Sequence, residues 1–466
     1  MKLQHTTTNR ARRPSGGGRS RGSVLIIVLW ICIGLVSVAL YFTNSMSYEL
    51  RAADNRVSGL AADQSIEGAA RYVGYILQNY ATNGAVPDST QFKCEAVPVG
   101  DAKFWLIGRD PAAGNSTDPY FGLIDEGSKL NLNYASTNAL LYLPNMTADF
   151  AGAIQDWRGT NGTQSLDYTS LGYLPKYAPF ETEDELRLVY GATSDLLVGE
   201  DLNLNGVLDP NEKDLNGNGE LDPGLLEYTT IYTREPNFHS DGSSLTNMDT
   251  ATVSQLTSLF RDDNVSSPDT RANAIFAYTH PGGPTTPANQ IKTFHGILDF
   301  AIVCRQANMT DNDIANIYND VTTSTNAYAY GRVNVNTAGV DVLAALFEGL
   351  NNGNQQTADA DAQTLITYRQ QNPGNLGSIA WVYDALGSGN ATLTSLRAGD
   401  YITTKSFQFT ADIAAVGPFG RGFRRVKFVF DMSDGAPKIL YRQDLGRLGW
   451  ALGEKARQTL LAQNTQ

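Results

Sequence analysis

The pattern of apolar and polar positions places a long helix at the start of this chain. An unbroken apolar run covers residues 24–42, with only Gly34 and Ser37 as small exceptions. Over residues 50–80, apolar side chains recur every three or four positions, as they do on one face of a helix. No proline occurs between the run and Pro87. We therefore predict one helix over residues 23–80, apolar all round at first and amphipathic afterwards.

The apolar run is long enough to cross a membrane. No charged side chain occurs between Arg21 and Glu49, and at about 1.5 Å rise per residue such a helix spans a hydrocarbon core of roughly 30 Å. The preceding basic residues are Arg10, Arg12, Arg13, Arg19 and Arg21. A basic flank stays in the cytoplasm, so we expect everything after residue 43 to be exported. A secretory signal peptide would have a shorter apolar run, followed by a cleavage site of small residues, so this segment does not match one. A plain single-pass membrane anchor is an open alternative.

Segments with strand-like patterns stand on both sides of the middle of the chain. Residues 104–107 and 120–124 are rich in aromatic and β-branched side chains. Residues 406–413 and 425–430 alternate between apolar and polar, and a glycine-rich connection joins them. Residues 438–442 add a third segment of this kind. The pattern predicts an antiparallel hairpin that joins the earlier strands in one sheet.

Two short motifs resemble each other, and both run into a helical pattern. Residues 125–133 read Asp-Glu-Gly-Ser-Lys-Leu-Asn-Leu-Asn, and residues 331–338 read Gly-Arg-Val-Asn-Val-Asn-Thr-Ala. We interpret them as the starts of two helical units, which end at residues 179–189 and 376–383. Asn336 or Thr337 is then the expected cap of the second helix. Chance likeness between two helix entries is the alternative.

The junction before the apolar run resembles a type IV prepilin processing site. In such a site a prepilin peptidase would cut after Gly22 and leave Ser23 as the first residue of the mature chain. Most pilins and pseudopilins carry a glutamate at mature position five, where this chain has Ile27. The lack of that glutamate is typical of the general secretion pathway protein K family, the largest minor pseudopilin of type II secretion.

The downstream motifs resemble the same family. Residues 125–133 are similar to its D-E-x-G-K-L-N-L-N, residues 331–338 to its G-K-I-N-V-N-T-A, and residues 179–189 to its A-P-F-x-S-x-x-E-L-R-L-V. The resemblance covers most of the chain. It thins over residues 234–325, to which we assign no role.

The resemblance implies an α+β fold in four parts. Residues 1–22 are the prepilin leader, and residues 23–80 are a transmembrane and assembly helix of the pilin type. Residues 81–133 together with 400–443 form a pilin-like α/β head with a small antiparallel sheet. Residues 134–399 form a large all-α inserted domain of two SAM-like or helix-hairpin-helix-like units, with calcium loops at residues 200–227.

One motif in the inserted region is chemically specific, namely a twelve-residue calcium loop with Gly206 at its sharp turn. Its ligands, at positions one, three, five, seven, nine and twelve, are Asp201, Asn203, Asn205, the backbone carbonyl of Val207, Asp209 and Glu212. Hard oxygen ligands in this number favour Ca²⁺ over Zn²⁺, which prefers nitrogen and sulfur. The alternative is a solvated turn rich in Asp, Asn and Gly that holds no ion.

A second possible calcium loop follows thirteen residues later. Its ligands are Asp214, Asn216, Asn218, Glu220 and Asp222. Leu225 stands at position twelve, so Glu227 or Glu200 has to supply the last carboxylate. Neither loop has the long flanking helices of an EF-hand pair, and residues 199–224 have little apolar surface to bury. We therefore expect structural ions that order this segment and stabilise the exported part by mass action.

Composition fits an exported globular protein. The 466 residues are 42% hydrophobic, which is enough for two or more folding units. The formal net charge of −13 argues against nucleic acid as a partner. Cys32 lies in the apolar run, which leaves Cys94 and Cys304 in an oxidising compartment. A disulfide between these two is a hypothesis.

The chain carries no signature of an enzyme. It lacks the G-x-S-x-G, H-E-x-x-H, G-x-x-x-x-G-K-[ST] and C-x-x-C patterns, and its four histidines stand in no catalytic motif. The resemblance instead implies an assembly protein of the inner membrane, with its bulk in the periplasm. In the family this subunit sits at the pseudopilus tip with other minor pseudopilins.

Two hypotheses from other functional classes stay open. One is a membrane-anchored, exported calcium-binding adhesin, which would not be cut at Gly22. The other is an exported hydrolase that uses the acidic loop as a metal site.

Overall fold

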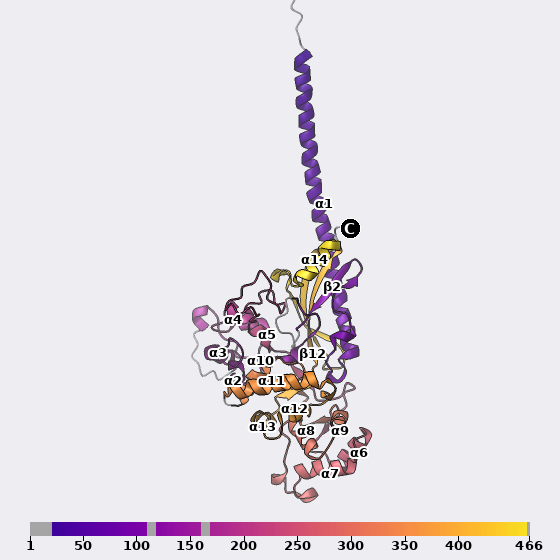
Figure 1. Cartoon of the computed structure of the whole chain (residues 1–466), viewed down its shortest axis with the longest axis vertical. Coiled ribbons are helices and arrows are strands. Elements are labelled where there is room, and N and C mark those ends of the chain that lie inside the picture. The colour runs from indigo at the N-terminus through magenta and orange to yellow at the C-terminus, as the bar shows by residue number, and fades with distance from the viewer. Residues whose placement is uncertain (1–20, 110–117, 160–167, 352, 464–466) are drawn as a thin grey trace, which may run out of the picture. The chain divides into compact units, whose positions relative to one another are not determined.

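A computed structural model describes residues 21–109, 118–159, 168–351 and 353–463 of the chain. Residues 1–20, most of the predicted leader, lie outside the described residues. The chain divides into two compact units, Met1–Val57 and Ser58–Gln466. The predicted α+β class is confirmed, because a long helix, an antiparallel sheet and many shorter helices follow one another along the chain (Figure 1).

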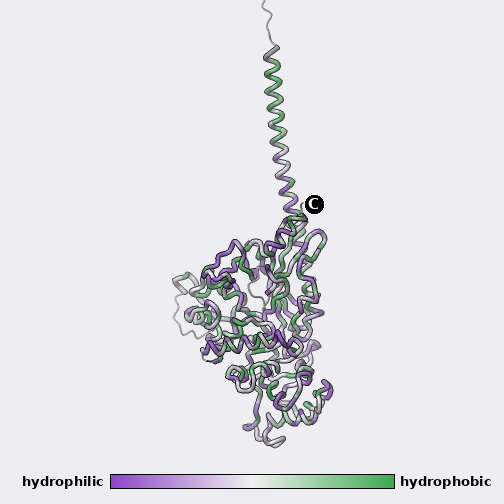
Figure 2. Tube along the Cα trace, viewed as in Figure 1, coloured by the Kyte–Doolittle hydropathy of each residue, from purple (hydrophilic) through white to green (hydrophobic). Residues whose placement is uncertain are grey.

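The predicted long helix is present as α1, Arg21–Tyr80. Residues 24–42 of α1 are all exposed, and this stretch is strongly hydrophobic (Figure 2). By length and composition, this helix is able to cross a membrane once. From Ser58 onward α1 belongs to the second compact unit, where one side of the helix is buried. The buried positions are Ser58, Gly59, Ala62, Ser65, Ile66, Ala69, Ala70, Val73, Ile76 and Leu77.

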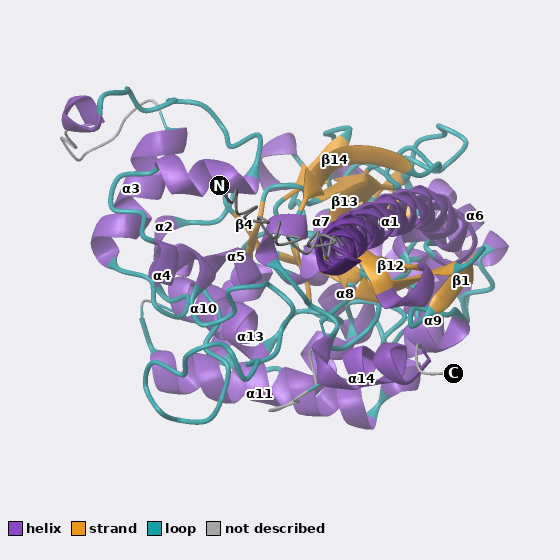
Figure 3. Cartoon of the chain, turned by 90° about the horizontal axis from the view of Figure 1, so that it is seen from above, coloured by secondary structure: helices purple, strands orange, loops and turns teal. Residues whose placement is uncertain are grey.

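A six-stranded antiparallel sheet forms the head. Its strands are β1 (Val97–Val99), β2 (Ala102–Ile107), β3 (Ile124–Asp125), β12 (Gln408–Gly417), β13 (Arg421–Asp431) and β14 (Lys438–Asp444). The order is β1-β2-β12-β13-β14, and β3 pairs with the first half of β12 (Figure 3). The early and late strands therefore join one sheet, as predicted. Of residues 120–124, only Ile124 and an isolated bridge at Phe121 take part.

The two faces of this sheet are covered by different parts of the chain. Phe104 and Leu106 of β2 pack into a core that α1 closes. Trp105 and Ile107 point to the opposite face, because successive side chains of a strand alternate. There they pack against Ala451, Leu452 and Leu460. The second cover includes a helix absent from the sequence prediction, α14, Gly453–Gln463.

A third core is built from residues between Leu130 and Ile402. The helices of this region are α2 (Thr137–Leu141), α3 (Ala148–Arg158), α4 (Ser194–Val198), α5 (Leu225–Tyr228), α6 (Val253–Asp262), α7 (Pro268–Thr279), α8 (Ile297–Gln306), α9 (Asp311–Ile317), α10 (Val340–Leu350), α11 (Gln355–Gln371), α12 (Trp381–Leu386) and α13 (Ala391–Arg397). The unassigned residues 234–325 contribute α6, α7, α8 and α9.

The prediction that the inserted region is all-α was wrong, because its connecting segments form short strand pairs. The pairs are β4 (Leu130–Asn131) with β5 (Thr229–Thr230), β6 (Arg234–Pro236) with β9 (Tyr328–Tyr330), β7 (Thr246–Asn247) with β8 (Val321–Thr322), and β10 (Val333–Asn334) with β11 (Ile402–Thr403). Pairing satisfies the backbone N–H and C=O groups of segments that run between buried helices.

Both copies of the repeated motif adopt the same turn. The side-chain oxygen of Asn131 accepts the backbone N–H of Asn133 at 2.9 Å. The side-chain oxygen of Asn334 accepts the backbone N–H of Asn336, also at 2.9 Å. Each first asparagine thus bends the chain between a short parallel strand and the helices that follow.

The rest of each helical unit is attached to this turn in the same way. The second asparagine of the motif donates to the carbonyl of Phe180 at 3.0 Å in the first unit, and to that of Leu376 at 3.1 Å in the second. Arg158 donates to two backbone carbonyls of the first turn, and Arg369 donates to the equivalent two of the second. The likeness of the two motifs is therefore structural and not chance.

Asp125 links the head to the second helical unit. Its carboxylate accepts hydrogen bonds from the backbone of Gly127 and the side chains of Asn334, Thr337 and Ser406. The predicted capping role of Asn336 or Thr337 was wrong, since α10 begins after Gly339 without a side-chain cap. Burial raises the pKa of Asp125 to about 6, against the opposing effect of its donors.

Candidate metal centre

The first predicted loop closes on the carboxylates at its two ends. Asp201 accepts backbone N–H groups of Asn205 at 2.9 Å and Gly206 at 2.7 Å. Glu212 accepts those of the third and ninth loop residues at 3.2 and 3.0 Å. Gly206 has a φ of 82°, which glycine adopts without the steric cost of a Cβ. The backbone of the loop therefore holds its first and last acidic side chains in place.

The polar side chains between these ends converge. Asp209 Oδ2 accepts hydrogen bonds from Nδ2 of Asn203 at 2.6 Å and of Asn205 at 2.9 Å. Asn203 Oδ1 is buried and has no hydrogen-bond partner among the described residues. Buried polar oxygens nearly always have a partner in folded proteins. An orphaned amide oxygen beside carboxylates is therefore a suitable ligand for a cation.

The residues of this loop suit a hard divalent cation. Asp201, Asn203, Asn205 and Val207 are at most 5% exposed. Burial raises the pKa of Asp201 and of Glu212, so their ionised forms are disfavoured where no cation balances them. In the described ranges, no three His, Cys, Asp or Glu side chains form a metal cluster. The ligand set here instead combines carboxylates with amide and backbone oxygens, which calcium sites commonly use.

The second loop repeats this geometry in a more exposed setting. Asp214 accepts three backbone N–H groups of the loop, at 2.6, 3.2 and 2.8 Å. Asp222 Oδ2 accepts from Nδ2 of Asn216 at 2.6 Å and of Asn218 at 3.0 Å. Glu220 donates its backbone N–H to Asn218 Oδ1, as the seventh residue of the first loop does to Asn205. The two loops therefore share one fold.

Glu200 supplies the carboxylate that the second loop lacks. It accepts backbone N–H groups of the second and ninth loop residues at 2.5 and 3.1 Å, much as Glu212 serves the first loop. Glu227, the other residue considered from the sequence, forms an ion pair with Arg109 at 2.8 Å. The geometry thus favours Glu200 over Glu227 as the last ligand.

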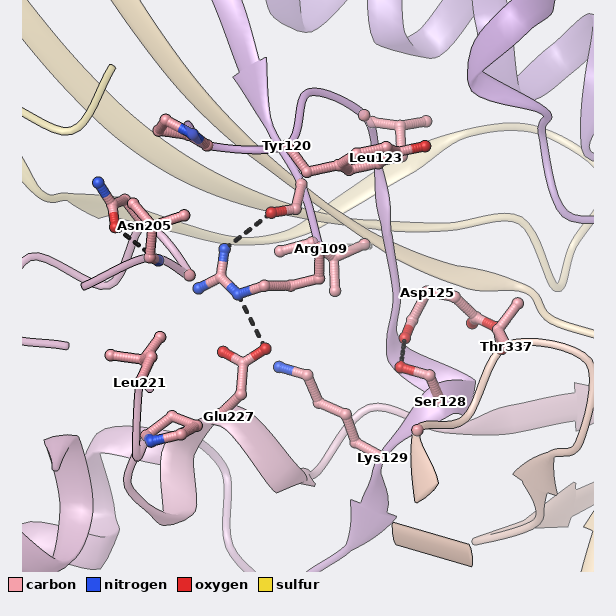
Figure 4. Close-up of a pocket in the computed structure, with 18 of the residues that line it drawn as sticks. Arg109, Tyr120, Leu123, Asp125, Ser128, Lys129, Asn205, Leu221, Glu227 and Thr337 are labelled. Atoms are coloured by element: carbon pink, nitrogen blue, oxygen red, sulfur yellow. Dashed lines mark hydrogen bonds and ion pairs between the residues drawn. The ribbon is translucent and has the colours of Figure 1, made fainter. Parts of the chain in front are cut away.

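Two arginines of the head donate hydrogen bonds to the backbone of the first loop. Arg109 extends from just beyond β2 and pairs with Glu227 (Figure 4). It also donates to the carbonyl of Leu204 at 3.1 Å. Arg425 of β13 is fully buried, donates to the same carbonyl at 2.7 Å and pairs with Asp412 of β12. The loop is therefore built into the head, although it belongs to the inserted region by sequence. Sequence reasoning missed both arginines, because backbone acceptors leave no pattern in the sequence.

The first loop also contacts the end of the chain. Asn203 Nδ2 donates to the carbonyl of Trp450 at 3.1 Å. Asn205 Nδ2 donates to the carbonyl of Ala451 at 3.4 Å. These carbonyls lie immediately before α14, so two predicted ligand side chains are in direct contact with the C-terminal segment.

A cavity of about 810 Å³ lies between the two loops and the head. Its lining includes Asn205 from the first loop, Leu221 from the second, and Asp125 and Lys129 from the first repeated motif (Figure 4). Both loops therefore border one space, through which an ion from the solvent can approach them.

The hypothesis of a Cys94–Cys304 disulfide was wrong for this structure. Cys94 is half-buried beside the core between α1 and the sheet, whereas Cys304 is buried in the third core. Both are free thiols, as is Cys32. The two cysteines thus belong to different cores, and no disulfide joins them in this structure.

Comparison with known proteins gives a structural match of low score. No protein-family model and no curated protein matches the chain. Among solved structures, a chain of "The Crystal Structure of the GspK-GspI-GspJ complex from enterotoxigenic Escherichia coli Type 2 Secretion System" matches with 13% sequence identity. The match covers 46% of this chain and 78% of that chain, with a TM-score of 0.16. By itself it establishes neither the fold nor the function.

Proposed function

We propose that this chain is a minor pseudopilin of a type II protein secretion system, similar to protein K of the general secretion pathway. One observation carries the proposal. In α1, a single helix, an exposed apolar stretch continues into an amphipathic part that packs on an antiparallel sheet. Such a helix suits a subunit that is first held in a membrane and later assembled through the same helix. The helical units inserted between β3 and β12 supply the bulk expected of the largest minor pseudopilin.

The proposal assigns the start of α1 to prepilin processing. Prepilin peptidase cuts between Gly22 and Ser23, which lie in the first turn of the helix. Before assembly the mature chain is anchored in the inner membrane with its bulk in the periplasm. It then joins other minor pseudopilins at the pseudopilus tip. Ile27 supports that position, since a tip subunit does not need the carboxylate that pairs with the amino terminus of a neighbouring subunit.

The proposal also includes calcium as a structural cofactor. The first loop would hold one ion through its six predicted ligands, and the second would hold another with Glu200 as the added carboxylate. The orphaned oxygen of Asn203 and the raised pKa values of Asp201 and Glu212 support an ion in the first loop. Bound calcium neutralises these carboxylates and so stabilises the inserted region.

Genetic complementation tests the assembly role. Deletion of the gene is expected to stop export through the type II system of the host, and the unmodified gene should restore it. Gly22→Ala removes the glycine before the cut and should fail to restore export. Gly18→Ala, a matched change within the leader, should restore it. Normal export after deletion would exclude the pseudopilin function.

The membrane-anchored calcium-binding adhesin is the second candidate function. The anchor and the two loops suit it equally well, but an adhesin needs no cut at Gly22 and no partner subunits. In that case Gly22→Ala would behave like the unmodified chain, and deletion would impair surface attachment while leaving export intact.

A further inference from the structure

The amides of Asn203 and Asn205 in the first loop each contact more than one part of the chain. Asn203 Oδ1 is buried and has no hydrogen-bond partner among the described residues. Its Nδ2 donates both to Asp209 and to the carbonyl of Trp450. The Nδ2 of Asn205 likewise donates to Asp209 and to the carbonyl of Ala451. One side chain thus contacts both the candidate ion site and the C-terminal segment.

The second loop provides an internal comparison. Asn216 and Asn218 occupy the same two positions, and their Nδ2 atoms donate to Asp222. Neither donates to another part of the chain among the described residues, and both lie in an exposed loop. The two loops therefore have the same pair of asparagines, but among the described residues only the pair in the first loop contacts the C-terminal segment.

The C-terminal segment covers one face of the head sheet. The ring of Trp450 lies 5.2 Å from that of Phe423 on β13, and its Nε1 donates to the carbonyl of Gly453 at 2.8 Å. The residues that follow pack on Trp105 and Ile107 of β2. Within the described part of the chain, the carbonyls of Trp450 and Ala451 accept their hydrogen bonds from the first loop. Loss of these donors would leave two backbone acceptors near this core without their partners.

We propose that Asn203 and Asn205 couple calcium binding in the first loop to the ordering of residues 450–463 on the sheet. Each amide gives its oxygen to the ion and its N–H group to a C-terminal carbonyl. An aspartate at either position supplies a ligand oxygen but no donor, and it places negative charge against the carbonyl oxygen. The inference rests on the proposed calcium site and adds a function to it, namely control over whether this face of the sheet is covered.

Hydrogen–deuterium exchange of the full-length chain in detergent micelles tests this coupling. With Ca²⁺ present, the backbone amides of residues 450–463 should exchange roughly tenfold more slowly than after chelation, because two hydrogen bonds to this segment are kept. Asn203→Asp with Asn205→Asp keeps a ligand oxygen at each position but changes the affinity, so exchange is compared at Ca²⁺ concentrations that calorimetry shows to saturate each protein. In that variant, exchange of residues 450–463 should be fast whether or not Ca²⁺ is present.

The matched control is Asn216→Asp with Asn218→Asp in the second loop, which should keep slow exchange of residues 450–463 in Ca²⁺. Calcium binding by each variant reports that its loops are folded. Slow exchange of residues 450–463 in the Asn203 and Asn205 variant would overturn the coupling, as would equal exchange of the unmodified chain with and without bound Ca²⁺. If the unmodified chain bound no Ca²⁺ at all, the proposed calcium site itself would be wrong.

Discussion

Arginines that are buried or half-buried join separate parts of this molecule by binding backbone carbonyls. Arg158 and Arg369 hold the two repeated turns, and Arg425 holds the first loop against the sheet. A guanidinium offers five donors in a fixed fork, so one side chain can satisfy two carbonyls at once. Burial lowers the pKa of Arg369 to about 10, which leaves it charged at neutral pH. Loss of the Arg369 side chain would therefore remove two charge-assisted hydrogen bonds.

Replacement of Arg369 tests this role. Arg369→Ala should lower the free energy of unfolding by about 2–4 kcal/mol, because the carbonyls of Val335 and Ala338 stay buried without a donor. Chemical denaturation measures the change. Arg187→Ala removes an exposed arginine that pairs with Asp184, and it should cost less than about 0.5 kcal/mol. Equal effects of the two substitutions would contradict the proposed role of Arg369.

Asp125 predicts a pH dependence of stability. Its pKa is raised by burial to about 6, above the value of about 3.9 for an unfolded aspartate. The folded state thus favours the protonated carboxyl of Asp125. Its contribution to the free energy of unfolding is complete below pH 4 and is lost as the pH rises through 6. The loss amounts to about 2–3 kcal/mol. Unfolding at saturating Ca²⁺ between pH 4.5 and 7.5 measures it, and Asp125→Asn, which does not titrate, should lack this component. An identical pH profile for both proteins would contradict the prediction.

At the scale of elements, the contact between α1 and the β12–β13 hairpin depends on glycine. A Cβ on Gly417 would lie 2.2 Å from the carbonyl oxygen of Ser58. A Cβ on Gly422, which has a φ of 69°, would lie 2.5 Å from the backbone nitrogen of Gly59. Backbone therefore packs directly on backbone at this point, and larger residues would separate the helix from the hairpin.

A single methyl group tests this close approach. Gly422→Ala should destabilise the fold by about 2–4 kcal/mol, since the methyl group meets the backbone of α1 and the left-handed conformation disfavours alanine. Thermal unfolding monitored by circular dichroism measures the loss. Gly389→Ala, where a Cβ has no atom within 4 Å, is the matched control and should change stability little. Normal stability of the Gly422 variant would mean that the hairpin does not pack closely on α1.

Sequence periodicity predicted the elements that carry strong and regular patterns. The long helix and the β12–β13–β14 hairpins follow from apolar spacing over many residues. Helix α14 escaped prediction because its apolar pattern is weak, with Leu460 as its buried leucine. Two-residue strands such as β4 and β10 are too short to show a period. Their pairing is decided by distant partners.

The candidate site was predictable where function fixes the spacing of residues. The twelve-residue calcium pattern predicted candidate ligands in the first loop, and it left Glu200 and Glu227 as the two candidates for the last ligand of the second loop. The choice between them depends on Arg109, which pairs with Glu227 from a site 118 residues away. The role of Thr337 is likewise decided by a residue distant in sequence. Its hydroxyl donates to Asp125, 212 positions away, and does not cap the adjacent helix.

At the scale of the whole molecule, calcium should determine how stable the second compact unit is. Calorimetry of the full chain should show two bound ions. The Tm should rise with Ca²⁺, by an amount equivalent to about 2.7 kcal/mol for each ion at 100 times its Kd. Asp201→Ala with Glu212→Ala should remove one ion. Glu200→Ala should remove the other, whereas Glu227→Ala should keep both. Unchanged binding in the Asp201 and Glu212 variant would rule out the first loop as the site.

The proposed assembly role depends on one peptide bond at the start of α1. If this chain is the proposed pseudopilin, prepilin peptidase cuts it between Gly22 and Ser23, and the same helix then leaves the membrane for the filament. Intact mass spectrometry of the chain purified from membranes of cells that contain prepilin peptidase reports the terminus directly. We expect the mature chain to begin at Ser23. We expect the Gly22→Ala variant to keep residues 1–22. An uncut unmodified chain in those membranes would contradict the proposed role.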